Sequence, residues 1–468
     1  MLLKCLNCGK SYVTDRVISF CESCDSPLIY SSDYQKIREN IYFSDDPSFW
    51  RYSSLLPHIE NKYRVSIGEG RTPLFKAIRL GSVFRLNNLF LKDETRNPTN
   101  SFRDRAASLL VSHALSLDFR EVICASNGNL GAAISAYCAK ASIKCNIVTP
   151  KKVDVGKLSQ MKIYDANIIS RGETIDESIR FVLKEGERRG LYPASSGLNP
   201  LILEAQKTIS FEIIEQVGVP DFVVAPMGDG GTIYSLWKGF KEFYELGLSS
   251  KIPRMIGVQS TTCAPIVKAF TENSKVERFE NGSTNALGIY VLEPINGTLA
   301  LSIIKESNGL AVSVSDKEII KAQKLLAVEE GIYGELASSA TVSALSKMID
   351  SKIVDSDSLV VCVITGSGLK DPYVLAALTS SSKQINLADR VNLKLQILRL
   401  ISLGETYGYS LWNSLSRSVT LQAIYQHLNE LEERLLINSS EKNNRKYYNI
   451  TAKGLKVLNA LEELALLL

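Results

Sequence analysis

Four cysteines near the beginning of the chain have the spacing of a metal site. Cys5 and Cys8 form one C-x-x-C pair, and Cys21 and Cys24 form a second pair after a short loop. Four thiolates at this spacing suit a tetrahedral Zn²⁺ ion, and four protein ligands leave no open position for catalysis. We therefore predict a zinc-ribbon-like segment over residues 1–35 with a structural zinc. The alternatives are a ribbon that has lost its metal and a redox-active pair.

A second candidate for chemistry is an arginine in the segment of residues 97–105, which reads N-P-T-N-S-F-R-D-R. This segment resembles the N-P-T-G-S-F-K-D-R segment of threonine synthases, a branch of the fold-type II enzymes that use pyridoxal phosphate. In that family the lysine of S-F-K-D-R forms the Schiff base with the cofactor. Arg103 stands at the position of that lysine in this chain.

The replacement of lysine by Arg103 changes what this position can do. A Schiff base needs a neutral amine with a free lone pair, which a lysine supplies when its pKa is lowered. A guanidinium stays protonated and has no such lone pair, but its planar set of donors can hold an anion. We therefore expect no catalytic residue at Arg103 and no covalent cofactor, although non-covalent binding of pyridoxal phosphate stays open. The alternatives are a surface arginine after a turn and an artificial substitution.

A glycine-rich loop follows the apolar strand expected at residues 221–225. It reads P-M-G-D-G-G-T over residues 226–232 and leads into a helix. Glycines let backbone amides point into one cup, and a helix N-terminus favours an anion. The loop is therefore a candidate phosphate cup. Asp229 would weaken phosphate binding if its carboxylate points inward.

Further segments resemble threonine synthases in the same order along the chain. Residues 126–131 read S-N-G-N-L-G, and the resemblance implies that Asn129 contacts the cofactor ring. Residues 365–371 read T-G-S-G-L-K-D, and the resemblance places the Thr365 hydroxyl beside the pyridine nitrogen. The expected ligand- or cofactor-binding residues are Ser101, Phe102, Arg103, Asn129, Gly228, Asp229, Gly230, Gly231, Thr232 and Thr365.

The elements that must position these residues are strands that alternate with helices. This order predicts an α/β class, doubly wound and two-lobed, with the site between the lobes. It is the fold-type II fold that the resemblance implies, and we assign it to residues 36–378. A polar linker is expected over residues 379–390.

The C-terminal residues 391–468 carry another pattern. Helical segments at 393–403, 404–411 and 420–435 precede two short strands at 436–438 and 446–450 and a last helix. The runs G-Y-S-L, I-Y-Q-H-L-N-E-L-E and R-K-Y-Y-N-I-T-A-K-G resemble a winged helix-turn-helix of the PadR type. The resemblance implies binding to double-stranded DNA. The alternative is a winged helix that makes only protein contacts.

In a winged helix the third helix reads base edges and the wing contacts phosphates. The candidate DNA-binding residues are Thr420, Gln422, Tyr425, Gln426, Asn429, Lys442, Arg445 and Lys446. The last helix carries Leu458, Leu461, Ala465 and Leu468 on one stripe, which we interpret as the seam of a homodimer. A two-fold dimer would present two recognition helices to a palindromic site.

Composition limits the remaining possibilities. The chain has 468 residues and a net charge of +4, and this small charge over so long a chain says little about nucleic acid. No apolar run approaches the length of a membrane span, and the start lacks a signal-peptide pattern. The other five cysteines are scattered, which favours a reducing compartment, and we expect a cytoplasmic protein.

The leading hypothesis is a DNA-binding transcriptional regulator. Its sensor would be a threonine synthase-like pseudoenzyme that binds an amino acid or a phosphorylated metabolite. The alternative is a working threonine synthase with an atypical site, in which another lysine, such as Lys92 or Lys370, reaches the cofactor. A third hypothesis is that the protein is an interaction scaffold that neither catalyses a reaction nor binds DNA.

Overall fold

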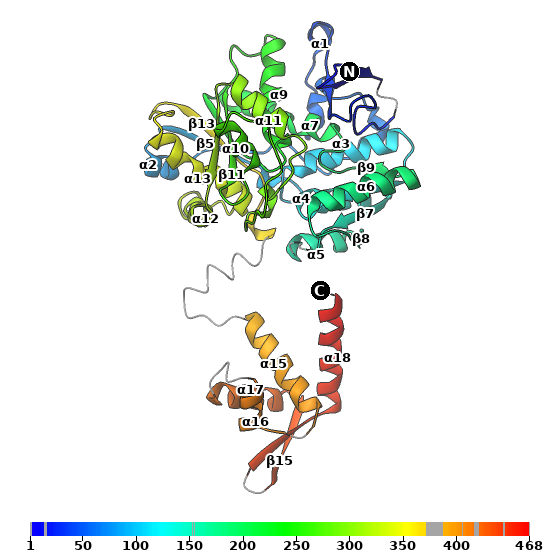
Figure 1. Ribbon diagram of the computed structural model, residues 1–468, viewed down its shortest axis with the longest axis vertical. Helices are drawn as coiled ribbons and strands as arrows, with labels where there is room; N and C mark the ends of the chain where they lie inside the picture. The colour runs from blue at the N-terminus through cyan, green and yellow to red at the C-terminus, as the bar shows by residue number, and fades with distance from the viewer. Residues whose placement is uncertain are drawn as a thin grey trace. The chain divides into compact units, whose positions relative to one another are not determined.

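The structure is a computed structural model that describes residues 2–13, 16–151, 153, 155–370, 387–404, 406–415, 421–442 and 445–467. The chain divides into two compact units, Met1–Pro372 and Tyr373–Leu468 (Figure 1). Each unit has its own hydrophobic core. In the part of the chain that the structure describes, no helix is long and apolar enough to cross a membrane.

The first unit contains a six-stranded sheet. Its neighbouring strands pair in parallel, except that the edge strand β4 is antiparallel to β5. The central strands consist of buried apolar residues on both faces, as in a sheet covered by helices on each side. In spatial order the strands are β12 (Leu310–Val314), β11 (Arg254–Ser260), β10 (Phe222–Pro226), β13 (Leu359–Ile364), β5 (Asn88–Asp93) and β4 (Leu74–Lys76).

A second sheet of four parallel strands forms the other half of this unit. Its strands are β8 (Asn167–Ser170), β7 (Lys144–Thr149), β6 (Glu121–Ala125) and β9 (Tyr192–Pro193). Two mainly parallel sheets joined by helices confirm the predicted two-lobed α/β architecture.

Thirteen described helices belong to the first unit and pack around the two sheets (Figure 1). They are α1 (Tyr34–Asn40), α2 (Ile78–Phe84), α3 (Arg103–Ser116), α4 (Asn129–Ala141), α5 (Val155–Ile163), α6 (Ile175–Arg189), α7 (Leu201–Gln206), α8 (Thr208–Val217), α9 (Gly231–Glu245), α10 (Pro265–Thr271), α11 (Gly297–Glu306), α12 (Asp316–Glu330) and α13 (Leu336–Asp350). Short 3₁₀ turns lie at Phe49–Leu55, Asn61–Tyr63, Glu94–Arg96, Leu287–Ile289 and Gly368–Lys370.

Helix α3 begins at Arg103 and lies in the interior of the first unit. It is buried from Asp104 to Ala114 on all sides. Its polar side is covered by the preceding arm of the chain. The Ser108 hydroxyl donates to the carbonyl of Val65 at 2.6 Å and accepts from the indole of Trp50 at 2.9 Å. A polar face can therefore be buried here because each of these groups has a partner.

The chain begins with a small antiparallel sheet of three strands. These are β1 (Leu2–Cys5), β2 (Ser11–Tyr12) and β3 (Leu28–Ser31), in the order β2-β1-β3. Alternate side chains such as Leu3, Tyr12 and Tyr30 are buried in the core of the first unit. The ribbon therefore packs as part of this unit.

The second unit contains α15 (Leu387–Ser402), α16 (Gly408–Ser414), α17 (Leu421–Glu433) and α18 (Ala452–Leu467). Its sheet has the order β14 (Thr406–Tyr407), β16 (Arg445–Ile450), β15 (Ile437–Lys442) and is antiparallel. The core includes Ile397, Leu411, Ile424 and Leu428. Three helices, a two-stranded hairpin and a last helix are the expected winged-helix order.

Helix α16 begins at Gly408 and lies against Tyr425 of α17. A Cβ atom on residue 408 would lie 2.5 Å from a ring carbon of Tyr425. A glycine is therefore required where the two helices approach. Of the stripe predicted as a dimer seam, Leu458 instead packs in the core of its own unit. The side chains of Leu461, Ala465 and Leu468 lie outside the described residues.

Candidate functional site

A cavity in the first unit brings most of the predicted site residues together. It is lined by residues from both sheets' loops, including Phe102, Arg103, Asn129 and Thr365. Six of the seven residues of the glycine-rich loop, Pro226 and those from Gly228 to Thr232, also line it. Ser101 is fully buried and lies just outside the lining. Ser19, Pro27 and Leu28 add a wall from the N-terminal ribbon segment.

Backbone bonds fix the turn that directs Arg103 into the cavity. The amide of Phe102 donates to the carbonyl of Thr365 at 2.9 Å, and Ser101 forms a bridge with Gly366. Asp104 accepts from both the amide and the hydroxyl of Thr99 at 3.0 Å. Burial raises the pKa of this carboxyl to about 7. The start of α3 is thus held on both sides of Arg103.

Among the described residues, the guanidinium of Arg103 has one hydrogen-bond partner, the Ser196 hydroxyl. It lies 4.6 Å from the ring centre of Phe102, and its Nη1 donates to the Ser196 hydroxyl at 3.2 Å. Burial lowers the pKa of Arg103 to about 10, with Asp229 and Glu335 opposing the shift. The group is therefore still charged at neutral pH. A guanidinium has five N–H donors, so it can bind an anion in the cavity.

The glycine-rich loop carries its acidic side chain into the cavity wall. The carboxylate of Asp229 accepts from the backbone amide and the side-chain amide of Asn296, at 3.3 and 2.5 Å. Burial raises the pKa of Asp229, while the bonds from Asn296 and the charge of Arg103 oppose this. Gly230 has φ of +94°, and a Cβ there would lie 2.7 Å from the Asn296 carbonyl. The loop is therefore shaped by packing against residue 296.

Asn129 lies in a second polar group on the cavity wall. Its amide nitrogen donates to both oxygens of Glu335, at 2.9 and 3.0 Å. The same carboxylate forms an ion pair of 3.2 Å with Lys157. Thr365 lies beside them and exchanges a hydrogen bond of 3.0 Å with Ser338. Lys157 and Glu335 were not among the predicted site residues, although Lys157 lies in a G-K-L-x-Q-M run.

The two lysines considered as substitutes for the missing amine lie elsewhere. Lys92 donates to the carbonyl of Thr72 at 2.7 Å and forms an ion pair of 2.7 Å with Glu212. Lys370 donates to the carbonyl of Thr99 at 2.7 Å. Both are buried and neither lines the cavity. The lysine that does line it is Lys157.

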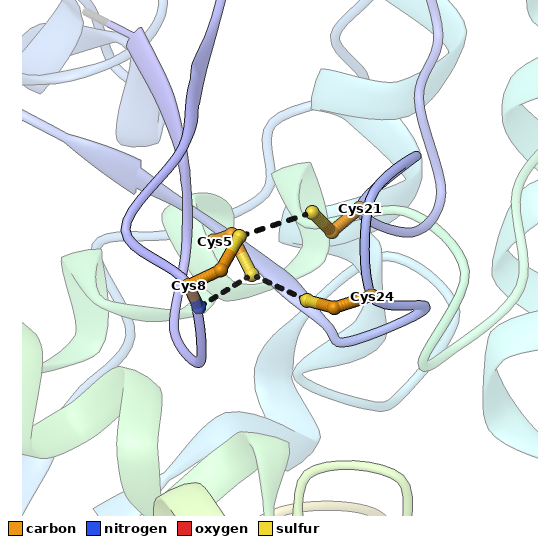
Figure 2. A group of neighbouring side chains, drawn as sticks. All are labelled: Cys5, Cys8, Cys21 and Cys24. Atoms are coloured by element: carbon orange, nitrogen blue, oxygen red, sulfur yellow. Dashed lines mark hydrogen bonds between the residues drawn. The ribbon is translucent and has the colours of Figure 1, made fainter.

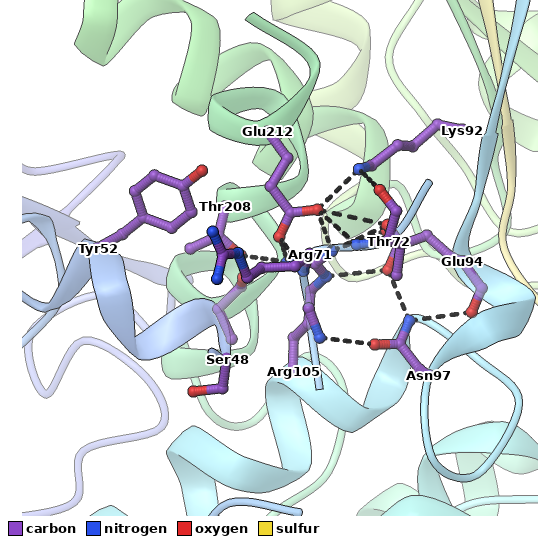
Figure 3. Close-up of polar contacts among 12 residues, drawn as sticks. Ser48, Tyr52, Arg71, Thr72, Lys92, Glu94, Asn97, Arg105, Thr208 and Glu212 are labelled. Atoms are coloured by element: carbon purple, nitrogen blue, oxygen red, sulfur yellow. Dashed lines mark hydrogen bonds and ion pairs between the residues drawn. The ribbon is translucent and has the colours of Figure 1, made fainter. Parts of the chain in front are cut away.

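A buried group of charges supports the helix that carries Arg103 (Figure 3). Arg105 donates to both oxygens of Glu94 and to both oxygens of Glu212. Lys92 pairs with Glu212 as well, so two cations face two carboxylates. These cations hold the pKa of Glu212 well below its usual range, against the effect of burial. The group ties α3 to α8 and β5.

The four cysteines of the ribbon come together from two loops (Figure 2). Their sulfur atoms all lie within 4.8 Å of one another, and Cys5–Cys24 and Cys8–Cys21 are each 3.5 Å apart. Tetrahedral zinc with Zn–S bonds of ~2.3 Å needs sulfurs about 3.8 Å apart. A hydrogen bond from Tyr12 helps lower the pKa of Cys21 to about 6. This arrangement forms a possible four-cysteine metal site.

In the second unit, the candidate DNA-binding residues of α17 lie on one exposed face of the helix. Gln422, Tyr425, Gln426 and Asn429 are exposed, while Ile424, Leu428 and Leu431 face the core. On the hairpin, Lys446 forms an ion pair of 2.9 Å with Glu432 of α17. Lys442 and Arg445 end the two paired strands, but their side chains lie outside the described residues, as does Thr420.

Comparison with protein families gives two matches. Residues 65–366 match the family described as pyridoxal-phosphate dependent enzyme. Residues 397–460 match the transcriptional regulator PadR-like family. The two matches fall in different compact units.

Relatives with known names are similar to most of this chain. A threonine synthase of Methanocaldococcus jannaschii is 38% identical over 407 residues, covering 85% of this chain and 100% of the relative. A threonine synthase of Methanosarcina acetivorans is 42% identical over 379 residues, covering 80% and 93%.

Solved structures support the fold of the first unit. Maize serine racemase has a TM-score of 0.58 at 18% identity and covers 75% of this chain and 98% of its own. The processed form of threonine deaminase isoform 2 from Solanum lycopersicum has a TM-score of 0.57 at 20% identity, covering 80% and 99%. At these identities the likeness concerns the fold alone.

The residues of the cavity do not fit pyridoxal phosphate bound covalently through a Schiff base at position 103. Arg103 stands where the amine is needed, and a guanidinium cannot form that bond. Asp229 also places a carboxylate in the loop expected to hold the phosphate, where it repels a second anion. Asn129 and Thr365 keep the residue types that the resemblance implies.

Proposed function

The chain belongs to the family of pyridoxal-phosphate-dependent enzymes and carries a C-terminal PadR-like domain, and from this premise we propose that it is a DNA-binding transcriptional regulator with a small-molecule sensor. The sensor is the threonine synthase-like unit, which has lost the covalent chemistry of its relatives. The regulator binds double-stranded DNA through α17 and the β15–β16 hairpin, as a homodimer.

The observation that carries this proposal is the identity and surroundings of Arg103. Arg103 lines the cavity, and its guanidinium can bind an anionic ligand. It cannot supply the neutral amine that the catalysis of the family needs. The exposed polar surface of α17, with Gln422, Gln426 and Asn429, supports the DNA-binding half of the proposal. Within this assignment, residues 1–35 form a zinc ribbon, 36–378 the sensor and 391–468 the winged helix.

The test uses pyridoxal phosphate, borohydride and peptide mapping of the full-length protein. The wild type is expected to give no reduced adduct on a cavity residue and no threonine from O-phosphohomoserine. Arg103→Lys is expected to gain an adduct at residue 103. Arg96→Lys is the matched control, because Arg96 is largely exposed and pairs with Asp93 outside the cavity.

A second candidate function is supported by the same comparisons. The named relatives are threonine synthases at 38% and 42% identity, and the cavity contains an amine on Lys157. A wild-type adduct on Lys157 together with threonine formation would establish this enzyme reading and refute the pseudoenzyme. The ion pair between Lys157 and Glu335 argues against it, because it favours the protonated amine.

A further inference from the structure

Three features of the cavity bear on what the proposed sensor binds: its charges, its unsatisfied polar atoms and its size. The lining contains the carboxylates of Asp176, Asp229, Glu293 and Glu335 and the cations of Arg103 and Lys157. Carboxylates are therefore in excess. Such a lining disfavours a phosphate dianion and favours a ligand that brings a positive charge.

The two groups that remain available for a ligand have opposite charge. Lys157 and Glu335 are paired with each other. Arg103 has its described hydrogen bond with the neutral Ser196. In the described part of the chain, Asp229 accepts hydrogen bonds from neutral groups of Asn296 and Ile295, and it forms no ion pair. Arg103 and Asp229 both line the cavity.

Gln206 provides an independent sign of a polar ligand. It lines the cavity at the end of α7 and is 0% exposed. Within the described residues, neither its amide oxygen nor its amide nitrogen has a hydrogen-bond partner. A buried amide without partners is costly, so a native protein normally gives it one. The donor and acceptor of Gln206 complement a hydroxyl or amide group.

The free volume of the cavity is small, about 150 Å³. A cavity of this size admits a molecule about as large as benzene. It suits a small amino acid better than a phosphorylated ring compound such as pyridoxal phosphate.

From these features we infer that the cavity binds a free, non-phosphorylated α-amino acid with a polar side chain. Arg103 and Ser196 hold its carboxylate, Asp229 holds its ammonium group, and Gln206 bonds to its side chain. This inference rests on the proposed sensor function and names the ligand class for that site. It separates the free amino acid from the phosphorylated metabolite, the two classes that the sequence left open.

The experiment measures binding directly to the full-length protein, without DNA. Calorimetry is carried out with the twenty common α-amino acids, O-phosphoserine, inorganic phosphate and pyridoxal phosphate. At least one amino acid with a hydroxyl or amide side chain is expected to bind. Its N-acetyl and methyl ester derivatives should each bind roughly tenfold or more weakly, because each removes one of the two charges. The three phosphate compounds should bind more weakly still.

Variants locate the contacts. Asp229→Asn should weaken the binding of the amino acid roughly tenfold or more. The same variant should bind phosphate compounds more tightly than the wild type does. Glu306→Gln is the control, because Glu306 lies outside the cavity lining, is 50% exposed and pairs with Lys241. Gln206→Met should lessen the preference for polar over apolar amino acids. Thermal unfolding of each variant confirms that it is folded.

Several outcomes would overturn the inference. They are binding of no amino acid, equal binding of the N-acetyl derivative, and binding of O-phosphoserine as tight as that of serine. An equal effect of Glu306→Gln and Asp229→Asn would overturn the role of Asp229. None of these results depends on DNA binding. A failure of the regulator proposal is seen separately, as the absence of an operator complex.

Discussion

Arg105 donates to both carboxylate oxygens of Glu212, at 2.5 and 2.8 Å, in a fully buried pair that joins α3 to α8. The same carboxylate also holds Lys92 at 2.7 Å and accepts from the amides of Arg71 and Thr72. One acidic side chain therefore satisfies donors from several segments around the start of α3. Loss of this buried charge should therefore destabilise the protein more than loss of a charge from an exposed ion pair.

Replacement of Glu212 by glutamine is expected to destabilise the first unit. The change leaves Arg105 with one charged partner and Lys92 with none, and breaking a buried pair costs about 3–5 kcal/mol. Urea unfolding followed by circular dichroism measures the difference from the wild type. Glu185→Gln is the control, because its pair with Arg188 involves a largely exposed arginine and should cost at most about 1 kcal/mol. Equal effects would contradict the buried network.

His113 is expected to make stability fall in mild acid. Burial lowers its pKa to about 4 from an ordinary 6.5, and its Nδ1 shares a 2.9 Å hydrogen bond with Tyr192. Between these pH values the unfolded chain takes up a proton that the folded chain does not. The stability present above pH 6.5 is therefore lost as the pH falls towards 4, by about 3 kcal/mol at most.

The measurement is urea unfolding of wild type and His113→Gln at several pH values from 4 to 7. The difference between the two should narrow or reverse towards pH 4, because the variant lacks this proton uptake. His58→Gln is the control, since His58 is exposed. Parallel pH curves for the wild type and His113→Gln would exclude His113 as the source.

One zinc ion per chain is expected on the four cysteines. Metal analysis should give about one zinc for the wild type and less for Cys5→Ala. Cys138→Ala is the control, because Cys138 is a buried cysteine of α4 outside the cluster. The ribbon segment lines the cavity through Ser19, Pro27 and Leu28, so chelation should also weaken ligand binding. Equal zinc in Cys5→Ala and the wild type would refute the site.

Variants of the proposed phosphate contacts and of the proposed base contacts are expected to affect DNA binding differently. Arg445→Ala and Lys446→Ala should weaken binding to all sequences and lower the slope of log affinity against log salt by about 1 each. Gln422→Ala and Gln426→Ala should instead lessen discrimination between sites, by about 1–3 kcal/mol per base contact. Fluorescence anisotropy over a range of salt distinguishes them. Lys324→Ala, on the first unit, should change neither.

Ligand binding and DNA binding are expected to be coupled. A ligand that shifts operator affinity does so by about 1–3 kcal/mol, roughly 5–150-fold, and DNA must shift ligand affinity equally. Titration of operator affinity with and without the amino acid measures this. Arg103→Ala should lose the response and keep DNA binding. Tight binding of the ligand with unchanged operator affinity would refute the sensor.

Local sequence patterns predicted several parts of this molecule because their signals lie within short segments. The cysteine pairs, the strand-loop-helix at the glycine-rich loop and the order of the last helices follow from spacing alone. The exposed surface of α17 also agrees with its helical period, since Gln422, Tyr425 and Gln426 are exposed and Ile424 is buried.

Other parts could not be predicted because they depend on contacts between distant segments. Glu335 is 178 residues from the lysine it pairs with, Lys157. Gln206 lies in an apolar helix and becomes a site residue only because the fold brings it to the cavity. The burial of both sides of α3 depends on the arm that includes Trp50, which no periodicity in α3 itself reveals.

The close approach of Gly408 to Tyr425 has a consequence for genetics. A side chain at residue 408 would push against a ring that belongs to the exposed surface of α17. A screen for altered operator preference should therefore recover substitutions of this glycine, although it carries no group that could read a base. Suppressors of such alleles should appear at Tyr425, as smaller residues that restore the space.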